Sequence, residues 1–85
     1  MDIEYSKEAL KYLNKLDAKS KRRLNEAFYD LSLESPKGDI KPIEGQRNLY
    51  RVKIGNFRAL FSFKTESNTI LITRIGPRGG IYKYL

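Results

Sequence analysis

Hydrophobic residues recur at two different spacings along the first 31 residues. Residues 2–5 alternate between polar and apolar side chains, which is typical of a short strand. Ser6 is a residue type that favours the helix N-cap, and it precedes an apolar series that predicts a helix of about ten residues: Ala9, Leu10, Leu13 and Leu16. Asp17 is the expected N-cap of a second helix, whose apolar stripe comprises Leu24, Ala27, Phe28 and Leu31.

The next segment has the pattern of a β-hairpin. Residues 49–54 and 57–63 each predict a strand, and only Gly55-Asn56 separates them, which fits a tight type I′ or II′ turn. That turn fixes the register, so Lys53 should lie opposite Arg58. One face is then apolar and is expected to meet the helices: Tyr50, Val52, Ile54, Phe57, Ala59, Phe61 and Phe63. The other face carries Arg51, Lys53 and Arg58, and we expect Arg58 to be exposed there, as we expect of Arg78.

The remaining segments complete an α+β prediction. Residues 35–39 should end the second helix and turn the chain, and residues 41–45 should continue the connection. Residues 64–68 predict a polar hairpin loop, and residues 69–75 a central strand that is apolar on both faces. The expected order is strand, helix, helix, then three strands of an antiparallel meander, with both helices packed on one face of the sheet. We expect residues 1–85 to form a single domain.

Composition narrows the chemistry that is available. The chain has no cysteine and no histidine, which excludes disulfides, a thiol nucleophile and a Ser-His-Asp triad. The glycines near the end do not form a nucleotide-binding motif, and we expect no cofactor and no metal. The first ten residues carry acids and lack an apolar run, and no segment reaches the length of a membrane span, so we expect a cytoplasmic protein without contact to a membrane.

Positive charge is concentrated in the second half of the chain. Lysine and arginine number 17 against 10 acidic residues, a net charge of +7. Residues 1–43 hold nine basic and eight acidic residues, a net of +1, whereas residues 44–85 hold eight basic and two acidic residues, a net of +6. Such a balance indicates a polyanionic partner, most often nucleic acid, bound by the second half.

The candidate site is the basic face of the hairpin. Arg51, Lys53 and Arg58 share that face with no acid nearby in sequence, and like charges at this spacing favour an anionic ligand. Arg78 follows the last strand and Tyr82 lies in a short tail, so both can join the same face. Arginine binds phosphate bidentately, and tyrosine can stack on a base. These residues suit a histidine-free ribonuclease, in which a 2′-OH attacks the adjacent phosphate.

Two stretches of the sequence carry a family resemblance. The hairpin YRVKIGNFR at 50–58 and the ending IGPRGGIY at 75–82, at this length and charge, resemble the RelE/ParE superfamily of type II toxins. The resemblance implies a prokaryotic, cytoplasmic toxin that cleaves mRNA in the ribosomal A site and is neutralised by a cognate antitoxin. It also implies roles: Lys53 or Arg51 helps to deprotonate the 2′-OH, Arg58 binds the scissile phosphate, Arg78 protonates or stabilises the leaving 5′-oxygen, and Tyr82 stacks on or orients the base.

The sequence departs from the family pattern at two positions, and two other functions are alternatives to mRNA cleavage. Arg51 stands where the family often has lysine, and Pro77 where many relatives have histidine, so the identity of the general base stays open. One alternative is a ParE-like inhibitor of DNA gyrase on the same fold, without nuclease activity. The other is a plain RNA-binding module, which needs aromatic platforms on the open face of the sheet, whereas Phe57, Phe61 and Phe63 fall on the expected core face.

Overall fold

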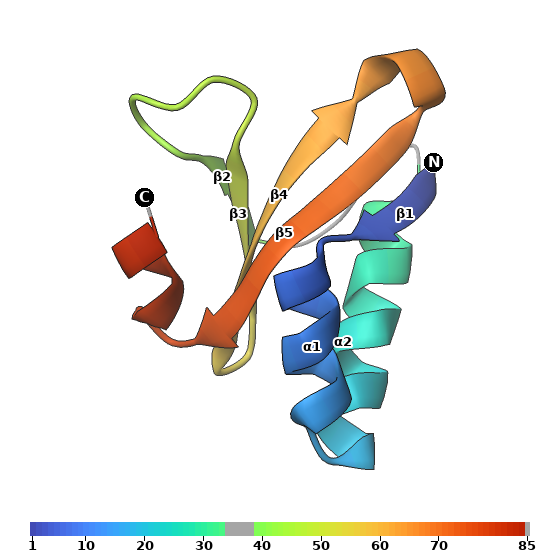
Figure 1. The fold of residues 1–85 in the computed structure, drawn as a ribbon, viewed down its shortest axis with the longest axis vertical. Helices are drawn as coiled ribbons and strands as arrows, with labels where there is room; N and C mark the ends of the chain where they lie inside the picture. The colour runs from blue at the N-terminus through green and yellow to red at the C-terminus, as the bar shows by residue number, and fades with distance from the viewer. Residues whose placement is uncertain (34–38, 85) are drawn as a thin grey trace.

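A computed structural model describes residues 1–33 and 39–84 of the chain. Its elements are β1 (Asp2–Tyr5), α1 (Lys7–Lys15), α2 (Ala18–Leu31), β2 (Asp39–Pro42), β3 (Tyr50–Ile54), β4 (Phe57–Lys64), η1 (Thr65–Ser67), β5 (Thr69–Pro77) and η2 (Gly80–Tyr84). The five strands form one sheet in the order β1-β5-β4-β3-β2. Both helices lie on one side of this sheet, and the short 3-10 helix η2 lies on the other (Figure 1). The predicted α+β class is confirmed.

Both α-helices begin at the predicted caps. The Ser6 hydroxyl accepts a hydrogen bond from the backbone N–H of Ala9 at 3.0 Å, and the Asp17 carboxylate accepts one from Ser20 at 3.2 Å. Hydrogen bonds from the side chain and from the backbone of Ser20 lower the pKa of Asp17. The prediction that Leu10 belongs to the buried apolar face of α1 is wrong, because Leu10 is 46% exposed. It lies one residue beyond Ala9 and therefore turns about 100° away from the face that packs on the sheet.

The hairpin of β3 and β4 has the predicted register. Lys53 lies opposite Arg58, and Ile54 lies opposite Phe57. Gly55 has φ +58°, and Asn56 is not among the residues with positive φ, which identifies the turn as type II′. This turn requires glycine at its first position, because other residues rarely adopt that conformation.

The apolar face of the hairpin packs on the helices as predicted. Phe61 and Ala59 are fully buried, and Val52 and Ile54 are nearly so. Three aromatic rings at the far end of the hairpin are mutually packed, with centroid distances of 5.3 to 5.6 Å: Tyr50, Phe61 and Phe63. From α2 the core receives the buried side chains of Leu24, Phe28 and Leu31.

The edges of the sheet add two features to the predicted meander. β1 pairs with β5 in parallel, so β5 has a neighbour on each side, as predicted for a central strand. The prediction that Asp39 lies in a turn and that the following residues continue a connection is wrong at residues 39–42, which pair with β3 as the antiparallel strand β2. This short, polar segment ends in Pro42, a composition that suits an edge strand but gives no alternating pattern. Residues 35–38 of the predicted turn lie outside the described residues.

A bulge in β5 changes which face its residues occupy. Leu60 pairs with Arg74 but Phe61 pairs with Ile72, so Thr73 is an extra residue. Ser6 holds this bulge, because its N–H donates to the carbonyl of Ile72 at 2.9 Å and its hydroxyl to that of Thr73 at 2.7 Å. As a result Ile72 and Ile75 both belong to the core, although they are three residues apart, and Arg74 falls on the opposite face.

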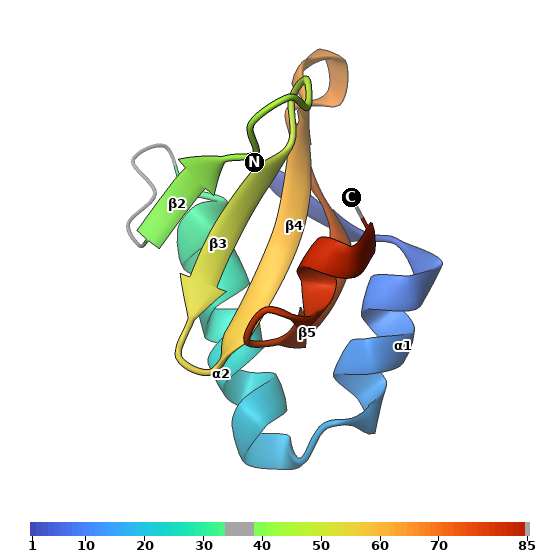
Figure 2. The same ribbon diagram turned by 90° about the vertical axis from the view of Figure 1, so that its left-hand side faces the viewer.

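The face of the sheet opposite the α-helices is open over much of its area. Figure 2 shows β2, β3 and β4 side by side on this face, with η2 in front of β5. We call it the outer face. Among the described residues, no helix is long and apolar enough to cross a membrane.

Candidate functional site

A hollow of about 360 Å³ lies on the outer face, where the hairpin meets β2 and the segment that follows β5. We call it the cation hollow. It is lined by Asp39, Lys41, Arg51, Lys53, Arg58, Arg78, Gly79 and Tyr82. All five residues expected at the site from the sequence are therefore brought together. Five cations face one carboxylate here, which is an arrangement suited to a phosphate-bearing ligand.

Arg58 forms the most ordered part of the cation hollow. Its side chain was expected to be exposed, but the residue is only 7% exposed, so that prediction is wrong. One guanidinium nitrogen, Nη1, donates to the backbone carbonyls of Gly55 at 3.0 Å and Phe57 at 2.9 Å. These bonds satisfy a charge that would otherwise be costly to bury, and they fix the guanidinium in place.

The type II′ turn also positions Arg78. The carbonyl of Asn56 accepts a hydrogen bond from the backbone N–H of Arg78 at 2.9 Å, while the neighbouring carbonyl of Gly55 holds Arg58. A Cβ atom at Gly55 would lie 2.5 Å from the guanidinium of Arg23, which comes from α2. The two residues of this turn therefore connect Arg58 and Arg78 to the helical layer.

Asp39 is a member of the cation hollow that sequence reasoning missed. Its carboxylate pairs with the guanidinium of Arg51 at 3.5 Å, and its backbone lies opposite Lys53 in the β2–β3 ladder. No acid lies near the three hairpin cations in sequence, and Asp39 joins them only in the folded protein. The signal was absent from the local pattern, because Asp39 enters the site only through the pairing of β2 with β3.

Tyr82 reaches the cation hollow because its neighbour Ile81 holds η2 against the sheet. Ile81 is fully buried, and it packs so closely on Gly76 that a Cβ there would lie 2.7 Å from its Cγ2 atom. Gly79, with φ +80°, turns the chain before η2. Ile81 thus fixes the short helix on the sheet and leaves Tyr82 41% exposed at the rim.

A larger hollow of about 710 Å³ lies over α2, but it lacks the charge asymmetry of the cation hollow. Its ionisable lining residues are two bases, Lys21 and Arg22, and two acids, Glu26 and Asp30. A balanced surface of this kind has no preference for a polyanion, so its size does not make it the better site.

Comparison with known proteins agrees with the fold. Residues 3–82 match the family model described as the ParE toxin of type II toxin–antitoxin systems, parDE. A protein of Methanocaldococcus jannaschii named RelE1 is 32% identical over 85 residues, covering 96% of this chain and 94% of the relative. Toxin RelE3 of the same organism is 31% identical over 88 residues, covering 99% and 98%.

Solved structures give the same result. The archaeal RelE–RelB complex from Pyrococcus horikoshii OT3 contains a chain that is 30% identical, with a TM-score of 0.75 and coverage of 92% of this chain and 94% of that one. The RelB–RelE antitoxin–toxin complex from Methanococcus jannaschii gives 26% identity and a TM-score of 0.74, with coverage of 96% and 98%. The fold and the site thus define a small toxin of the type II class. The chain belongs to the RelE/ParE superfamily, in its RelE-like branch.

Proposed function

We propose that this toxin is a ribosome-dependent endoribonuclease that cleaves mRNA in the ribosomal A site. The observation that carries the proposal is the cation hollow, in which Arg51, Lys53, Arg58, Arg78 and Tyr82 converge from separate elements. In the reaction, the 2′-OH attacks the adjacent phosphorus, its proton passes to a base, and the 5′-oxygen leaves with a proton. No metal or histidine is needed for these steps if cations stabilise the developing charge.

Arg58 and Arg78 are assigned to the phosphate and the leaving group. The guanidinium of Arg58 is held by two carbonyls through Nη1, so its Nη2 and Nε groups are the donors that can face a phosphate. Arg78 is exposed, and its backbone is tied to the same turn, which suits a group that closes on the 5′-oxygen. Fixed donors of this kind stabilise a charged transition state without reorganisation.

For the general base, the contacts favour Lys53 over Arg51. Arg51 is paired with Asp39, and a guanidinium does not lose its proton in proteins. Lys53 is exposed and lies directly opposite Arg58 in the cation hollow, and an amine, unlike a guanidinium, is a side chain that enzymes use as a general base. Tyr82, at the rim, is assigned to stacking on a base of the mRNA.

The proposed protein partner is a cognate antitoxin. Two of the similar structures are described as complexes of RelE with RelB, one of them as an antitoxin–toxin complex. We infer that this chain is neutralised in the same manner. Co-expression with its antitoxin should restore the growth of cells that express the toxin.

Primer extension in a cell-free translation reaction tests the proposed activity. Purified toxin should produce cuts within codons of a reporter mRNA when ribosomes are present, and none when they are omitted. Cuts in both reactions would identify a ribosome-independent nuclease. The absence of cuts in either reaction would contradict the proposal.

Inhibition of DNA gyrase is the second candidate, because the matching family model carries the ParE name. An inhibitor that acts only by binding a protein has no need for this set of cations and a tyrosine in one hollow. A supercoiling assay with purified gyrase decides between the two. We expect no inhibition at toxin concentrations that cleave mRNA.

A further inference from the structure

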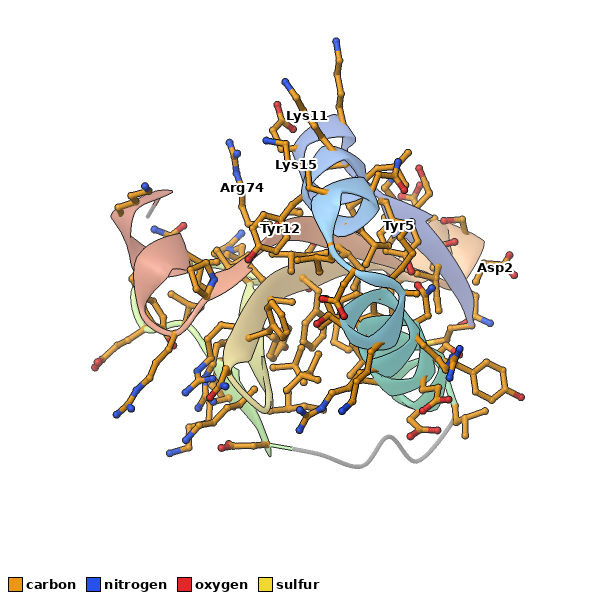
Figure 3. All side chains as sticks on the ribbon, turned by 90° about the horizontal axis from the view of Figure 1, so that it is seen from below. Asp2, Tyr5, Lys11, Tyr12, Lys15 and Arg74 are labelled. Atoms are coloured by element: carbon orange, nitrogen blue, oxygen red, sulfur yellow. The ribbon has the colours of Figure 1, made fainter. Side chains whose placement is uncertain are left out.

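A second group of cations lies outside the cation hollow, where α1 packs beside β5. Lys11 and Lys15 are one turn apart on α1, and Arg74 comes from β5. A cavity of about 150 Å³ brings them together, with Glu8, Tyr12 and Ile75 as the other lining residues. We call Lys11, Lys15 and Arg74 the α1–β5 cluster. Figure 3 shows Lys11 and Lys15 on α1, with Arg74 of β5 beside them.

The cluster gathers like charges from two neighbouring elements. Two lysines at i and i+4 on a helix repel each other, and Arg74 brings a third positive charge to the same cavity. Glu8 supplies the single acid among the lining residues, which leaves a local excess of two positive charges. Tyr12 lies in the same cavity, and burial raises its pKa, so its hydroxyl remains a hydrogen-bond donor.

The β5 bulge places Arg74, one member of this cluster, in line with the cation hollow. Arg74 lies opposite Leu60, and Leu60 lies opposite Arg51, so Arg74 and Arg51 occupy one row across the outer face. Strands are spaced about 4.8 Å apart, which separates these two arginines by about 10 Å along the row. Phosphates repeat every 3.4 Å along one strand of a helical nucleic acid, so a short stretch of a single strand spans this distance.

One further lysine lies on the surface between the cation hollow and the α1–β5 cluster. A cavity beside η2 shares Tyr12 and Ile75 with the cluster and adds Lys83. On its other side, η2 contributes Tyr82 to the cation hollow. Figure 2 shows η2 in front of β5, between the β3–β4 hairpin and α1.

We propose that the α1–β5 cluster is a second contact for the RNA backbone, binding phosphates that lie several nucleotides from the scissile one. The inference rests on the proposed function in taking RNA as the polyanion. Its task is affinity and orientation of the strand, because phosphate contacts fix register without reading sequence. The cluster touches no reacting atom.

The test measures RNA binding separately from cleavage. The probe is a fluorescein-labelled RNA of roughly 20 nucleotides, 2′-O-methylated throughout so that it cannot be cut, and its affinity is followed by anisotropy over a range of salt concentrations. The variant is Lys11→Gln with Lys15→Gln. The matched control is Lys19→Gln with Arg22→Gln, which removes the same charge from exposed positions on α2. Thermal unfolding of each variant checks that the fold is intact.

The expected difference lies in the salt dependence. Each lost phosphate contact lowers the slope of log affinity against log salt by about 0.7 on a single strand, so the variant should lose about 1.4. This corresponds to about 25-fold weaker binding at 0.1 M salt, if the two proteins bind equally at 1 M. The slope measured for the control variant should change by less than about 0.7, the value expected for one phosphate contact. Equal slopes in variant and control would overturn the proposal, as would no binding of the probe by the unaltered toxin.

A second experiment distinguishes whether the bound phosphates belong to ribosomal RNA or to mRNA. Co-sedimentation with vacant ribosomes reports contact with ribosomal RNA, and co-sedimentation that depends on added mRNA reports contact with the message. Loss of either in the lysine variant, and not in the control, supports the proposal and assigns the source. Unchanged sedimentation in both conditions contradicts it. Because binding is measured without cleavage, a toxin that binds through the cluster but cuts no mRNA would contradict the proposed activity alone.

Discussion

The two faces of the β3–β4 hairpin are built from alternating residues of the same strands, and they differ in what holds them in place. On the inner face, Val52, Ala59 and Phe61 are buried by contact with the helical layer. On the outer face, polar groups hold the arginines: the carboxylate of Asp39 holds Arg51, and two backbone carbonyls hold Arg58. Apolar burial supplies stability on one face, and directed hydrogen bonds fix charge for a ligand on the other.

The largest loss of stability is expected from a substitution in the buried inner face. Phe61→Ala removes a fully buried ring from the core and should destabilise the protein by about 3–5 kcal/mol, measured by urea denaturation. Lys53→Ala, from the outer face of the same hairpin, should change the free energy of unfolding by no more than about 0.5 kcal/mol. Similar losses of unfolding free energy in the two variants would contradict the statement that the inner face supplies the stability of the hairpin.

A smaller effect is expected where the two faces meet, at the turn. Gly55→Ala forces a side chain into a left-handed conformation, at a cost of about 1–2 kcal/mol, and displaces Arg23. Because the Gly55 carbonyl holds Arg58, cleavage should fall beyond what the loss of folded protein explains. Arg23→Ala in the same background opens the space and should restore part of the stability. A turn variant with unchanged cleavage would show that the turn does not position the arginine.

Ser6→Ala tests the bulge that sets which face Arg74 occupies. The substitution removes a helix cap and a hydrogen bond to Thr73, and it should destabilise the protein by about 1–2 kcal/mol in urea denaturation. Ser6→Thr keeps the hydroxyl and serves as the control. Equal stability of the Ala and Thr variants would contradict the role of this hydroxyl.

The smallest expected effect concerns pH. The N-cap bond lowers the pKa of Asp17 below its ordinary value of 3.8, so the carboxylate form is favoured in the folded protein. Its stabilising contribution is present above the ordinary pKa and is lost as the pH falls through the lower folded value. Asp17→Asn keeps a good cap without the charge, so its urea midpoint should decline less between pH 5 and 3. Parallel curves for the two proteins would exclude this contribution.

Local patterns were sufficient to predict the hairpin and the helix caps. A two-residue turn beginning with glycine fixes the pairing of Lys53 with Arg58, and short polar residues before apolar periods mark both caps. The gathering of Arg78 and Tyr82 with the hairpin cations followed from the expected proximity of the last strand.

Other features depend on long-range pairing and have no local signal. Asp39 reaches the site only because β2 adds to the edge of β3. The bulge at Thr73 arises from a register set by β4 and held by Ser6, 67 residues away in sequence. The burial of Arg58 depends on carbonyls of a turn whose exact geometry a sequence pattern does not define.

The most direct test of the account compares two arginines in the ribosome-dependent cleavage assay. Arg78→Gln removes a cation from the hollow, and Arg22→Gln removes one from the balanced surface of α2, and both residues are exposed. Arg78→Gln should lower the rate of mRNA cleavage by about 100-fold or more, while Arg22→Gln cleaves as the unaltered toxin does. Equal cleavage by both variants would contradict the assignment of the cation hollow as the active site.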